Sequence, residues 1–497
     1  MTIKQGSETD RDAAAGSGLA RRIGYFLGPV LAVLIWLSAP PEGMSLAAWQ
    51  VVGLAAWMTS WWITEAVPIP ATSILPPIVL PLLGVMPIGE ALAPYANPIM
   101  ALIFGGMVVA LALERWQLHR RLALTVLARV GGRPAALLAG FMLVSAFLSM
   151  WLSNSATTMM MLPIAVSVAA VICGQQVGAA AKPFTLALLL GIAYSASLGG
   201  LATLIGTPPN AMAAAYLRQH FGMEISFVDW MKVGLPAALL LLPAVWGVLR
   251  LMFAMPGRLD QAGRAYIADE LAAMGKMSAP ERRVAWIGLT MATAWLSSRW
   301  LRELPGLQGL SDAMIAILGA LAVLTLPSGL RAAAAADRQL LDWRATAGLN
   351  WGLLLLFGGG LSLAAGMSQS GLADWLGQQL AGLADMPVWM LLAALVAMVV
   401  FLTELTSNTA TTAALLPVLG ALAGATGLDP LLLAAPAALA ATCAFMMPVA
   451  TGPNAIVFSS GYISIPQMAR VGLILNLIAI VVLVPLGLWL APLIVSN

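Results

Sequence analysis

The chain has 497 residues, of which 61% are hydrophobic and only 9% are charged, and its net charge is +3. A soluble domain of this size could not cover its surface with so few charges, so the composition excludes a soluble globular protein. Apolar runs of about 18 to 25 residues recur from one end to the other, and each is long enough to cross a bilayer as a helix. Strands of a β-barrel would instead alternate in polarity at every second residue. We therefore predict an all-α polytopic membrane protein.

In chain order, eleven apolar segments are predicted to span the membrane. They lie near residues 23–39, 46–63, 71–87, 98–114, 184–203, 231–254, 285–301, 312–327, 349–367, 431–449 and 471–494. Two further apolar stretches, 134–172 and 387–424, are each interrupted in the middle by a cluster of Ser, Asn and Thr. Irregular backbone at membrane depth survives only inside protein or beside water. These two stretches are therefore predicted to form re-entrant hairpins whose tips lie near the bilayer centre.

Lys and Arg gather in four polar segments, and their positions predict the orientation of the chain. The segments are 4–22, 115–133, 258–283 and 331–344, whereas no Lys or Arg occurs from 345 to 469. By the positive-inside rule these four segments are cytoplasmic. With eleven spans, the N-terminus is then cytoplasmic and the C-terminus lies outside. The first hairpin enters from the cytoplasm and the second enters from outside.

Three landmarks occur once in each half of the chain, in the same order. They are Phe104-Gly105-Gly106 with Phe357-Gly358-Gly359, the segment 153–158 with 407–412, and the segment 206–211 with 450–455. Because the paired hairpins are predicted to enter from opposite faces, this order indicates an inverted repeat, an arrangement that secondary transporters use around a central site. The segment 255–284 joins the two halves and is predicted to be a cytoplasmic linker with one short amphipathic helix.

Each predicted hairpin tip brings a helix C-terminus and a helix N-terminus to one place. Unpaired carbonyls at the first suit a cation such as Na⁺, and unpaired amides at the second suit an anion. Hydroxyl and amide side chains at the tips can supplement both; they belong to Ser153, Asn154, Ser155, Ser407, Asn408 and Thr409. The alternative is that these side chains only cap their own backbone. Because two matched copies are present, we favour a binding site.

The segments with Pro and Asn, 206–210 and 450–454, follow runs of small residues. Proline removes a backbone donor and glycine loosens a helix, so each segment is predicted to be an unwound stretch that exposes carbonyls. A simple proline kink is the alternative. Opposite a hairpin tip, the carbonyls of such a stretch would complete a shell of oxygen ligands around Na⁺.

Neither polar motif contains Lys or Arg, although arginine is the expected clamp for a carboxylate or sulfate. We therefore expect an ion-coupled site in which Na⁺ binds first and attracts the anion. Glu404 lies three residues before Ser407 in apolar sequence. An intramembrane carboxylate is a functional candidate, and Glu404 could bind a cation, relay a proton or anchor neighbouring amides.

With these residues in view, the chain resembles the divalent anion–sodium symporter family. These are the INDY-type, Na⁺-coupled di- and tricarboxylate and sulfate transporters. The resemblance covers nearly the whole chain and rests on Trp-Trp-x-Thr-Glu-Ala at 61–66, both Ser-Asn motifs, and the segments 206–210 and 451–458. It implies a homodimer in the inner (plasma) membrane, with a scaffold domain and a transport domain that moves like an elevator.

The resemblance also implies a division of the chain. The expected parts are a cytoplasmic tail at 1–22, scaffold and the start of the first repeat at 23–133, the first transport half at 134–230, scaffold helices with the linker at 231–348, the start of the second repeat at 349–386, the second transport half at 387–470, and the last helix at 471–497.

The site residues follow from the family motifs by matching positions. The first Na⁺ site would use Ser149, Ser153, Asn154 and the carbonyl of Gly206, and the second Thr403, Thr406, Ser407, Asn408 and the carbonyl of Ala450. The anion would lie against the six tip residues given above, with Thr207, Thr451 and Gly452 nearby. This chain has Ser155 where the family usually has Thr, and Gly452 where some relatives have Pro, and both changes affect the shape of the pocket.

We therefore predict a secondary-active, Na⁺-coupled importer of a small divalent anion, with a C4-dicarboxylate such as succinate, malate or fumarate as the first choice. Sulfate or citrate is the runner-up, and an exchanger or a proton-coupled variant that uses Glu404 is a third possibility. The sequence contains no His-Glu-x-x-His and no Gly-x-Gly-Asp, so an enzyme is not expected. Na⁺ is the expected cofactor, the lipid bilayer and a small anion are the expected partners, and nucleic acid is not.

Overall fold

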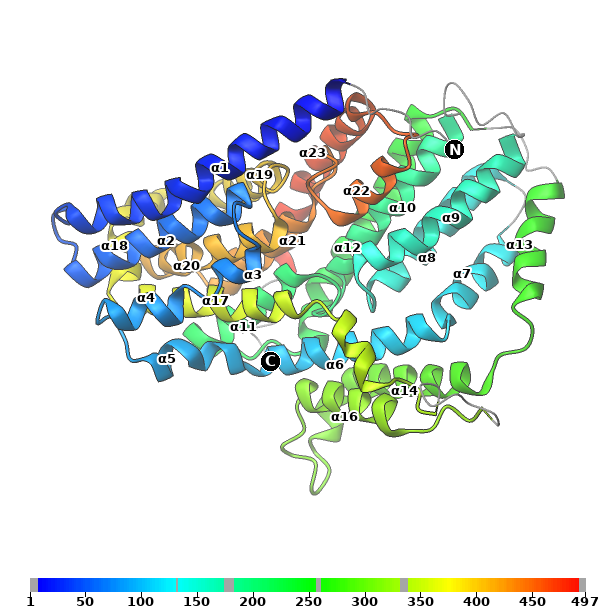
Figure 1. The fold of residues 1–497 in the computed structure, drawn as a ribbon, viewed down its shortest axis with the longest axis horizontal. Coiled ribbons are helices and arrows are strands. Elements are labelled where there is room, and N and C mark those ends of the chain that lie inside the picture. Colours follow the sequence, from blue (N-terminus) through cyan, green and yellow to red (C-terminus); the bar gives the residue numbers. More distant parts are fainter. Residues whose placement is uncertain (1–7, 131–132, 174–182, 256–260, 331–337, 491–497) are drawn as a thin grey trace. The chain divides into compact units, whose positions relative to one another are not determined.

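A computed structural model describes residues 8–130, 133–173, 183–255, 261–330 and 338–490, and these residues form helices joined by turns, without a β-strand (Figure 1). The described residues therefore have the predicted all-α fold. Residues 1–7 of the expected N-terminal tail lie outside the described ranges, as do Lys4, Arg258 and Arg331 of the basic segments.

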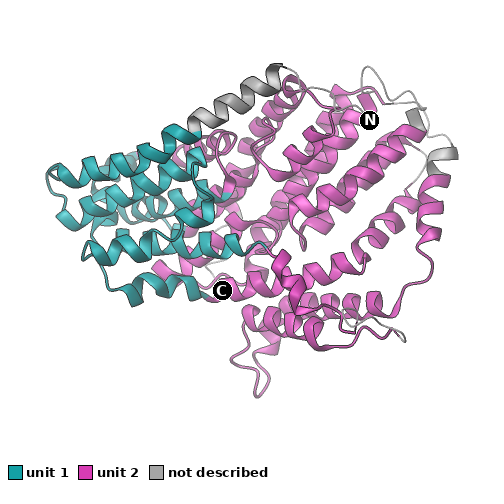
Figure 2. Ribbon diagram, in the orientation of Figure 1, with its two compact units in different colours: residues 1–97, 350–385, 409–430 teal, residues 98–349, 386–408, 431–497 magenta. Residues whose placement is uncertain are grey.

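The chain divides into two compact units (Figure 2). Unit 1 consists of Met1–Asn97, Asn350–Asp385 and Thr409–Pro430, and unit 2 consists of Pro98–Leu349, Met386–Asn408 and Leu431–Asn497. Each unit is thus assembled from segments of both halves of the sequence.

The helices of unit 1 are α1 (Glu8–Leu37), α2 (Leu46–Thr64), α3 (Ile69–Thr72), α4 (Pro76–Leu82), α5 (Ile88–Leu92), α17 (Trp351–Gln369), α18 (Leu372–Leu380) and, after its first residue, α20 (Asn408–Thr426), with the short 3-10 helices η1 (Ala93–Ala96) and η4 (Ala381–Asp385). The segment 71–87, which is one span in the sequence-based prediction, contains the end of α3, a turn and α4. Proline stands at the start of both helices and has no amide to continue a helical ladder, which explains the interruption.

The helices of unit 2 are α6 (Pro98–Arg115), α7 (Leu118–Arg129), α8 (Pro134–Ser149), α9 (Asn154–Cys173), α10 (Pro183–Leu201), α11 (Pro208–Phe221), α12 (Phe227–Met252), α13 (Gln261–Ala273), α14 (Ala279–Leu296), α15 (Ser298–Leu301), α16 (Asp312–Thr325), α19 (Val388–Leu402), α21 (Pro430–Thr442), α22 (Gly452–Ser459) and α23 (Ile465–Leu490), with the 3-10 helix η3 (Trp343–Gly348). The segment 255–284 contains α13 and the first turns of α14.

In the described part of the chain, seven helical segments are long and apolar enough to cross a membrane. They are Ile88–Arg115, Asn154–Val171, Pro183–Leu201, Phe227–Met252, Trp351–Gln369, Asn408–Thr426 and Ile465–Trp489. Five shorter apolar helical segments accompany them, among them Pro134–Ser149 and Val388–Leu402, which precede the two polar clusters.

The core of unit 2 is built around α10, whose residues Phe184–Leu201 are all buried. A helix that is apolar on every side must be enclosed by other helices, and α8, α9, α12 and α22 pack against it. A side chain at Gly199 would put its Cβ 2.1 Å from the carbonyl oxygen of Ala146. Glycine there therefore allows the backbones of α8 and α10 to touch, as small residues do in membrane helix packing.

Four breaks in the helices fall where the sequence places its polar motifs. Residues 150–153 separate α8 from α9, and residues 403–407 separate α19 from α20. Residues 202–207 separate α10 from α11, and residues 443–451 separate α21 from α22. The interruptions in 134–172 and 387–424 are confirmed. The segments 206–210 and 450–454 are unwound in the sequence-based prediction, but only residues 206–207 and 450–451 lie in the breaks, because a helix begins at Pro208 and another at Gly452. The unwound residues therefore lie mainly before the Pro-Asn sequences.

Candidate ion and anion sites

The first polar cluster lies at the break between α8 and α9. Ser149, the last residue of α8, is fully buried, and its Oγ donates to Oδ1 of Asn154, the first residue of α9, over 2.5 Å. The same amide end of Asn154 lies 3.2 Å from the carbonyl oxygens of Ala196 and Gly206. The cluster therefore brings together Ser149, Asn154 and Gly206 of the predicted first Na⁺ site, and it adds the carbonyl of Ala196, which the sequence motifs did not indicate.

The atoms of this cluster fit a cation. When Oδ1 of Asn154 points inward, it faces carbonyl oxygens without a proton between them, and such an arrangement is repulsive unless a positive ion lies among the oxygens. In the absence of an ion the opposite orientation satisfies the amide, since Nδ2 of Asn154 then donates to the carbonyls of Ala196 and Gly206 and to Oγ of Ser149. Binding of a cation would therefore require Oδ1 to turn inward. Hydroxyl, amide and unwound backbone oxygens are the ligands that transporters use for Na⁺, so the residues present match the ion implied by the sequence.

Gly200 lies directly against this cluster. A Cβ on Gly200 would lie 2.7 Å from Oδ1 of Asn154 and 3.0 Å from the carbonyl oxygen of Gly206. The first distance is too short for a carbon atom and the second is tight, so a side chain at residue 200 would displace the amide of Asn154 from its place beside the carbonyl of Gly206. The run of small residues before residue 206 thus makes room for the cluster.

The second polar cluster repeats the first at the break between α19 and α20. Oγ1 of the buried Thr403 lies 2.7 Å from Oδ1 of Asn408 and 2.8 Å from the carbonyl oxygen of Ala441. The hydroxyl residue and the asparagine are five positions apart in both clusters. The predicted pair Thr403 and Asn408 is therefore brought together, and Ala441 supplies a backbone oxygen that the sequence motifs did not indicate.

Asparagine holds both unwound segments in the same way. Nδ2 of Asn210 donates to the carbonyls of Gly200 over 2.9 Å and Thr203 over 2.8 Å. Nδ2 of Asn454 donates to the carbonyls of Ala444 over 3.1 Å and Met447 over 3.0 Å. In each case the acceptors stand ten and seven positions before the asparagine. The Pro-Asn motifs therefore contribute a side chain that fixes the unwound backbone.

A further contact anchors each unwound segment, and it differs between the halves. Oγ1 of Thr203 donates to the carbonyl of Met150 over 2.7 Å. In the second half, the buried carboxylate of Glu404 accepts from the amides of Phe445, Met446 and Met447 over 2.8 to 2.9 Å, and from Nδ2 of Asn476 over 2.7 Å. Of the three roles considered for Glu404, this geometry is that of an anchor for neighbouring amides.

Two of the residues expected around the anion face each other. Helix α9 packs against α22, and a Cβ on Gly452 would lie 2.0 Å from Oγ of Ser155. The two positions at which this chain departs from its family pattern therefore meet at one contact. The hydroxyl of Ser155 occupies the space that a side chain at residue 452 would need.

The remaining expected site residues take backbone roles or positions beside these clusters. Oγ of Ser153 accepts from the amide of Ala156 over 3.2 Å, and Oγ1 of Thr451 accepts from the amide of Asn454 over 3.2 Å, so both are helix caps. Thr207 precedes α11 at the equivalent position, and its Oγ1 lies 3.4 Å from Oγ1 of Thr442. The hydroxyl of Thr406 donates to the carbonyl of Leu402.

Ser407, Thr409 and Ala450 are the last of the expected site residues. Ser407 and Thr409 flank Asn408 at the start of α20 and are half-buried, and Thr409 belongs to unit 1. Ala450 is buried in the unwound segment before α22, where its amide donates to the carbonyl of Met447 over 3.3 Å. The capping alternative therefore describes Ser153 and Thr451, whereas Asn154 and Asn408 contact oxygen atoms outside their own helix turn.

Comparisons with known proteins place the chain in a family. The family model described as the sodium:sulfate symporter transmembrane region matches residues 19–496. The sodium-dependent dicarboxylate transporter SdcS of Staphylococcus aureus strain USA300 is 40% identical over 480 residues, which cover 95% of this chain and 92% of SdcS. The SdcS sequence of strain NCTC 8325 has the same identity and coverage.

Two solved structures are similar in fold. The YdaH transporter of Alcanivorax borkumensis has a TM-score of 0.55 and 16% identity, covering 81% of this chain and 86% of that chain. MtrF of Neisseria gonorrhoeae has a TM-score of 0.56 and 10% identity, covering 95% and 94%. At these identities the likeness concerns the fold alone.

Proposed function

Since the chain belongs to the sodium:sulfate symporter family, we propose that it imports a small divalent anion together with Na⁺, and that a C4-dicarboxylate such as succinate, malate or fumarate is its substrate. The protein is a multi-pass membrane transporter and not an enzyme. The observation that carries the proposal is the repeated cluster of a buried hydroxyl, an asparagine and backbone carbonyls at two helix breaks.

In the proposed mechanism, one Na⁺ binds in each cluster. Ser149, Asn154 and the carbonyl of Gly206 hold the first ion, with Ser153 beside them. Thr403, Asn408 and the carbonyl of Ala450 hold the second, with Thr406 and Ser407 beside them. Since neither motif contains Lys or Arg, the two bound cations supply the positive charge that an anion needs in a site at membrane depth.

The anion is proposed to lie against the hydroxyl and amide groups of the two motifs, near Thr207 and Thr451. The contact between Ser155 and Gly452 shapes one wall of this pocket. The likeness to a sodium-dependent dicarboxylate transporter favours a C4-dicarboxylate. Sulfate is the second candidate because the matching family model is described by sodium and sulfate, and citrate or an exchange mode is ranked below it.

The assembly and movement are proposed from the family resemblance and the charges. We propose a homodimer in the plasma membrane whose transport halves, 134–230 and 387–470, move against a scaffold formed by the remaining spans. The basic segments favour a cytoplasmic N-terminus and an external C-terminus. Glu404 is assigned to anchoring and not to proton transfer, because four donors already surround its carboxylate.

Uptake into proteoliposomes tests the proposal. An inward Na⁺ gradient should drive the accumulation of labelled succinate, whereas an equal K⁺ gradient should not. Unlabelled malate and fumarate should compete, and sulfate and citrate in the same competition assay rank the alternatives. Succinate accumulation that is the same with Na⁺ and K⁺ would refute coupling to Na⁺.

A further inference from the structure

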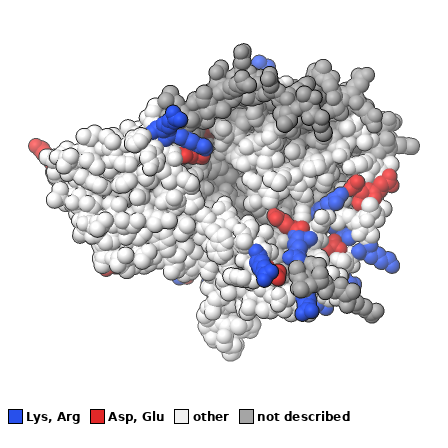
Figure 3. Space-filling view, in the orientation of Figure 1, with Lys and Arg blue, Asp and Glu red and all other residues white. Residues whose placement is uncertain are grey.

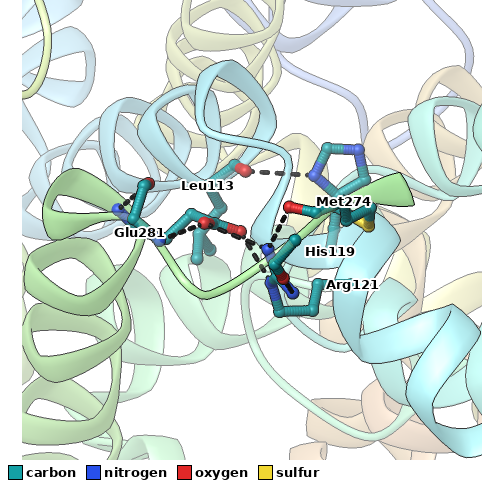
Figure 4. A network of polar contacts seen from close by, with 7 residues as sticks. Leu113, His119, Arg121, Met274 and Glu281 are labelled. Atoms are coloured by element: carbon teal, nitrogen blue, oxygen red, sulfur yellow. Dashed lines mark hydrogen bonds and ion pairs between the residues drawn. The ribbon is translucent and has the colours of Figure 1, made fainter. Parts of the chain in front are cut away.

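The loop that joins α8 to α9 carries a large aromatic side chain, Trp151, which the proposed ion and anion sites do not use. The loop lies between Ser149 and Asn154 of the first cluster and contains no charged residue, so its side chains cannot form an ion pair. Other parts of unit 2 do use ion pairs. Charged side chains of both signs gather over one part of it (Figure 3), and the pair of Arg121 and Glu281 joins α7 to the first turn of α14 (Figure 4).

Trp151 belongs instead to a stack of three aromatic rings. The rings of Trp151 and Phe227 are inclined by 21° with their centroids 6.0 Å apart, and those of Trp151 and Trp295 by 10° at 6.4 Å. Phe227 and Trp295 lie 4.5 Å apart at 12°. Nearly parallel rings at such distances attract each other beyond the effect of the area that they bury. The loop is therefore in contact with the start of α12 and with α14.

Asp312, at the start of α16, fixes the two rings on which Trp151 lies. Its carboxylate accepts from the amide of Phe227 over 2.6 Å, and its carbonyl accepts from Nε1 of Trp295 over 3.0 Å. Phe227 and Trp295 are fully buried, whereas Trp151 is half-buried. The two partners therefore form a fixed surface, and the loop packs on it through Trp151.

The start of α12 also contacts the second chain segment of the first cluster. Nε1 of Trp230 donates to the carbonyl of Leu201, the last residue of α10, over 3.0 Å. A Cβ on Gly234, one turn further along α12, would lie 2.2 Å from the same oxygen. The beginning of α12 thus contacts both the loop before Asn154 and the segment that leads to Gly206.

The second hairpin differs at the position of Trp151. Aligning Ser149 with Thr403 places Leu405 there, and 72% of Leu405 is exposed. A leucine has no ring to stack, and this one is mostly outside the packing. At this position, an aromatic contact supports the first hairpin and not the second.

We propose that Trp151 is a positioning residue for the first Na⁺ site. Its stack on Phe227 and Trp295 holds the loop so that Asn154 stays beside the carbonyl of Gly206. Without the stack, the loop occupies this position for only part of the time, and the apparent affinity for Na⁺ falls with that fraction. The proposal rests on the proposed function, because it requires Na⁺ to bind at the first cluster.

The stack crosses the proposed boundary between the first transport half and the scaffold. Trp151 and Phe227 belong to the transport half 134–230, whereas Trp295 belongs to a scaffold helix, α14. Movement of the transport half would separate Trp151 from Trp295 and leave its contact with Phe227. The first ion is therefore bound most tightly while Trp151 contacts Trp295, and it is released more easily after the movement.

Equilibrium binding of ²²Na⁺ to the purified full-length protein tests the proposal. Thr403→Val is the background, since it is expected to bind the first ion alone. In this background, Trp151→Leu should weaken Na⁺ binding by about tenfold because both ring contacts are lost. Trp295→Leu removes one of them and should weaken binding less, and Trp151→Phe keeps a ring that can stack and should stay closer to the affinity of the background. Because the second hairpin has leucine at this position, Trp151→Leu is expected to fold.

The matched control is Leu405→Ala in the Ser149→Ala background, which is expected to bind the second ion alone. Its Na⁺ affinity should change by less than about twofold, as for other exposed positions. Thermal unfolding of each variant separates positioning from general stability. A merely structural role lowers the melting temperature and leaves the Na⁺ affinity of the folded protein unchanged.

The outcomes separate this proposal from the proposed function. A wild-type protein that binds no Na⁺ would refute both. If the wild type binds Na⁺, an unchanged affinity in Trp151→Leu, with or without a loss of stability, would overturn the positioning role alone. Equal losses in Trp151→Leu and Trp151→Phe would also overturn it, because the role assigned to Trp151 depends on a ring that stacks.

Discussion

The unwound segments 202–207 and 443–451 are each followed by a Pro-Asn sequence, yet a hydroxyl anchors the first segment and a carboxylate anchors the second. Aligning Ser149 with Thr403 places Met150 at the position of Glu404. The asparagine contacts are repeated at the same spacing in both halves. The asparagine contacts beside the proposed ions are therefore the same in the two halves, whereas the side chains that anchor the unwound segments differ.

The position of a helix end explains the different supports. Helix α10 continues to Leu201, whereas α21 ends at Thr442, three positions earlier in the repeat. The amides of Phe445, Met446 and Met447 then lie beyond the helix and need acceptors at membrane depth. Glu404 supplies those acceptors. The early helix end also lets the carbonyl of Ala441 contact Thr403.

The largest expected effect tests whether the two halves are functionally alike. Asn154→Ala and Asn408→Ala should each lower Na⁺-driven succinate uptake by about 100-fold or more, because each removes an oxygen from a desolvated cation site. Uptake into proteoliposomes measures this effect, with size-exclusion chromatography as the check on folding. Thr325→Val is the control, since its hydroxyl only bonds within its own helix. Wild-type uptake by either asparagine variant would show that the two clusters are not both needed for transport.

A stability measurement tests how the supports differ. Glu404→Ala leaves three amides and Asn476 without their acceptor and should destabilise the protein by about 4 kcal/mol, whereas Thr203→Val should cost about 1 to 2 kcal/mol. Denaturant unfolding in detergent gives both values. Equal losses would show that the carboxylate adds nothing beyond a hydroxyl. A Glu404→Gln variant that keeps its stability but loses the pH dependence of uptake would instead assign proton transfer to Glu404.

A double-mutant cycle measures whether Ser155 of the first half and Gly452 of the second half act on each other. Gly452→Ala should displace the hydroxyl of Ser155 and weaken succinate binding by about tenfold, which is about 1.4 kcal/mol. Ser155→Gly in the same chain makes room for the new methyl group, so the double variant should lose less than the two single losses combined. Competition binding at saturating Na⁺ gives the four affinities. Additive losses would show that the two residues do not act on each other.

The smallest expected effect is on the acid stability of the protein and concerns Glu281. Like Glu404, Glu281 is a buried carboxylate that accepts hydrogen bonds, but it lies outside the predicted spans. Burial opposes ionisation of Glu281, but the bonds from Arg121 and Ser278 outweigh it and hold the pKa of Glu281 below its ordinary value. A lowered folded-state pKa stabilises the protein above the ordinary carboxyl pKa, and this stability is lost as the pH falls through the folded-state value. Melting temperatures should fall in acid, and Glu281→Gln should reduce that fall. An unchanged acid profile in Glu281→Gln would remove Glu281 as the titrating anchor.

The sequence predicted the helix breaks and the main members of both clusters, because polar residues in apolar runs and their repetition are visible in one dimension. It did not predict the carbonyls of Ala196 and Ala441, since a backbone oxygen carries no residue-type signal. It left three roles open for Glu404, because the three amides it anchors lie about 40 residues away and become exposed only where α21 ends. The interruption of 71–87 could have been predicted from its prolines.

The central claim is that each half contributes one Na⁺ site built on a hydroxyl and an asparagine. Equilibrium binding of ²²Na⁺ to the purified protein tests it most directly, in the wild type and in Ser149→Ala and Thr403→Val. The account predicts two ions per wild-type chain in the presence of succinate, and the loss of one ion in each variant. A wild-type chain that binds a single ion, or variants that still bind as many ions as the wild type, would contradict it.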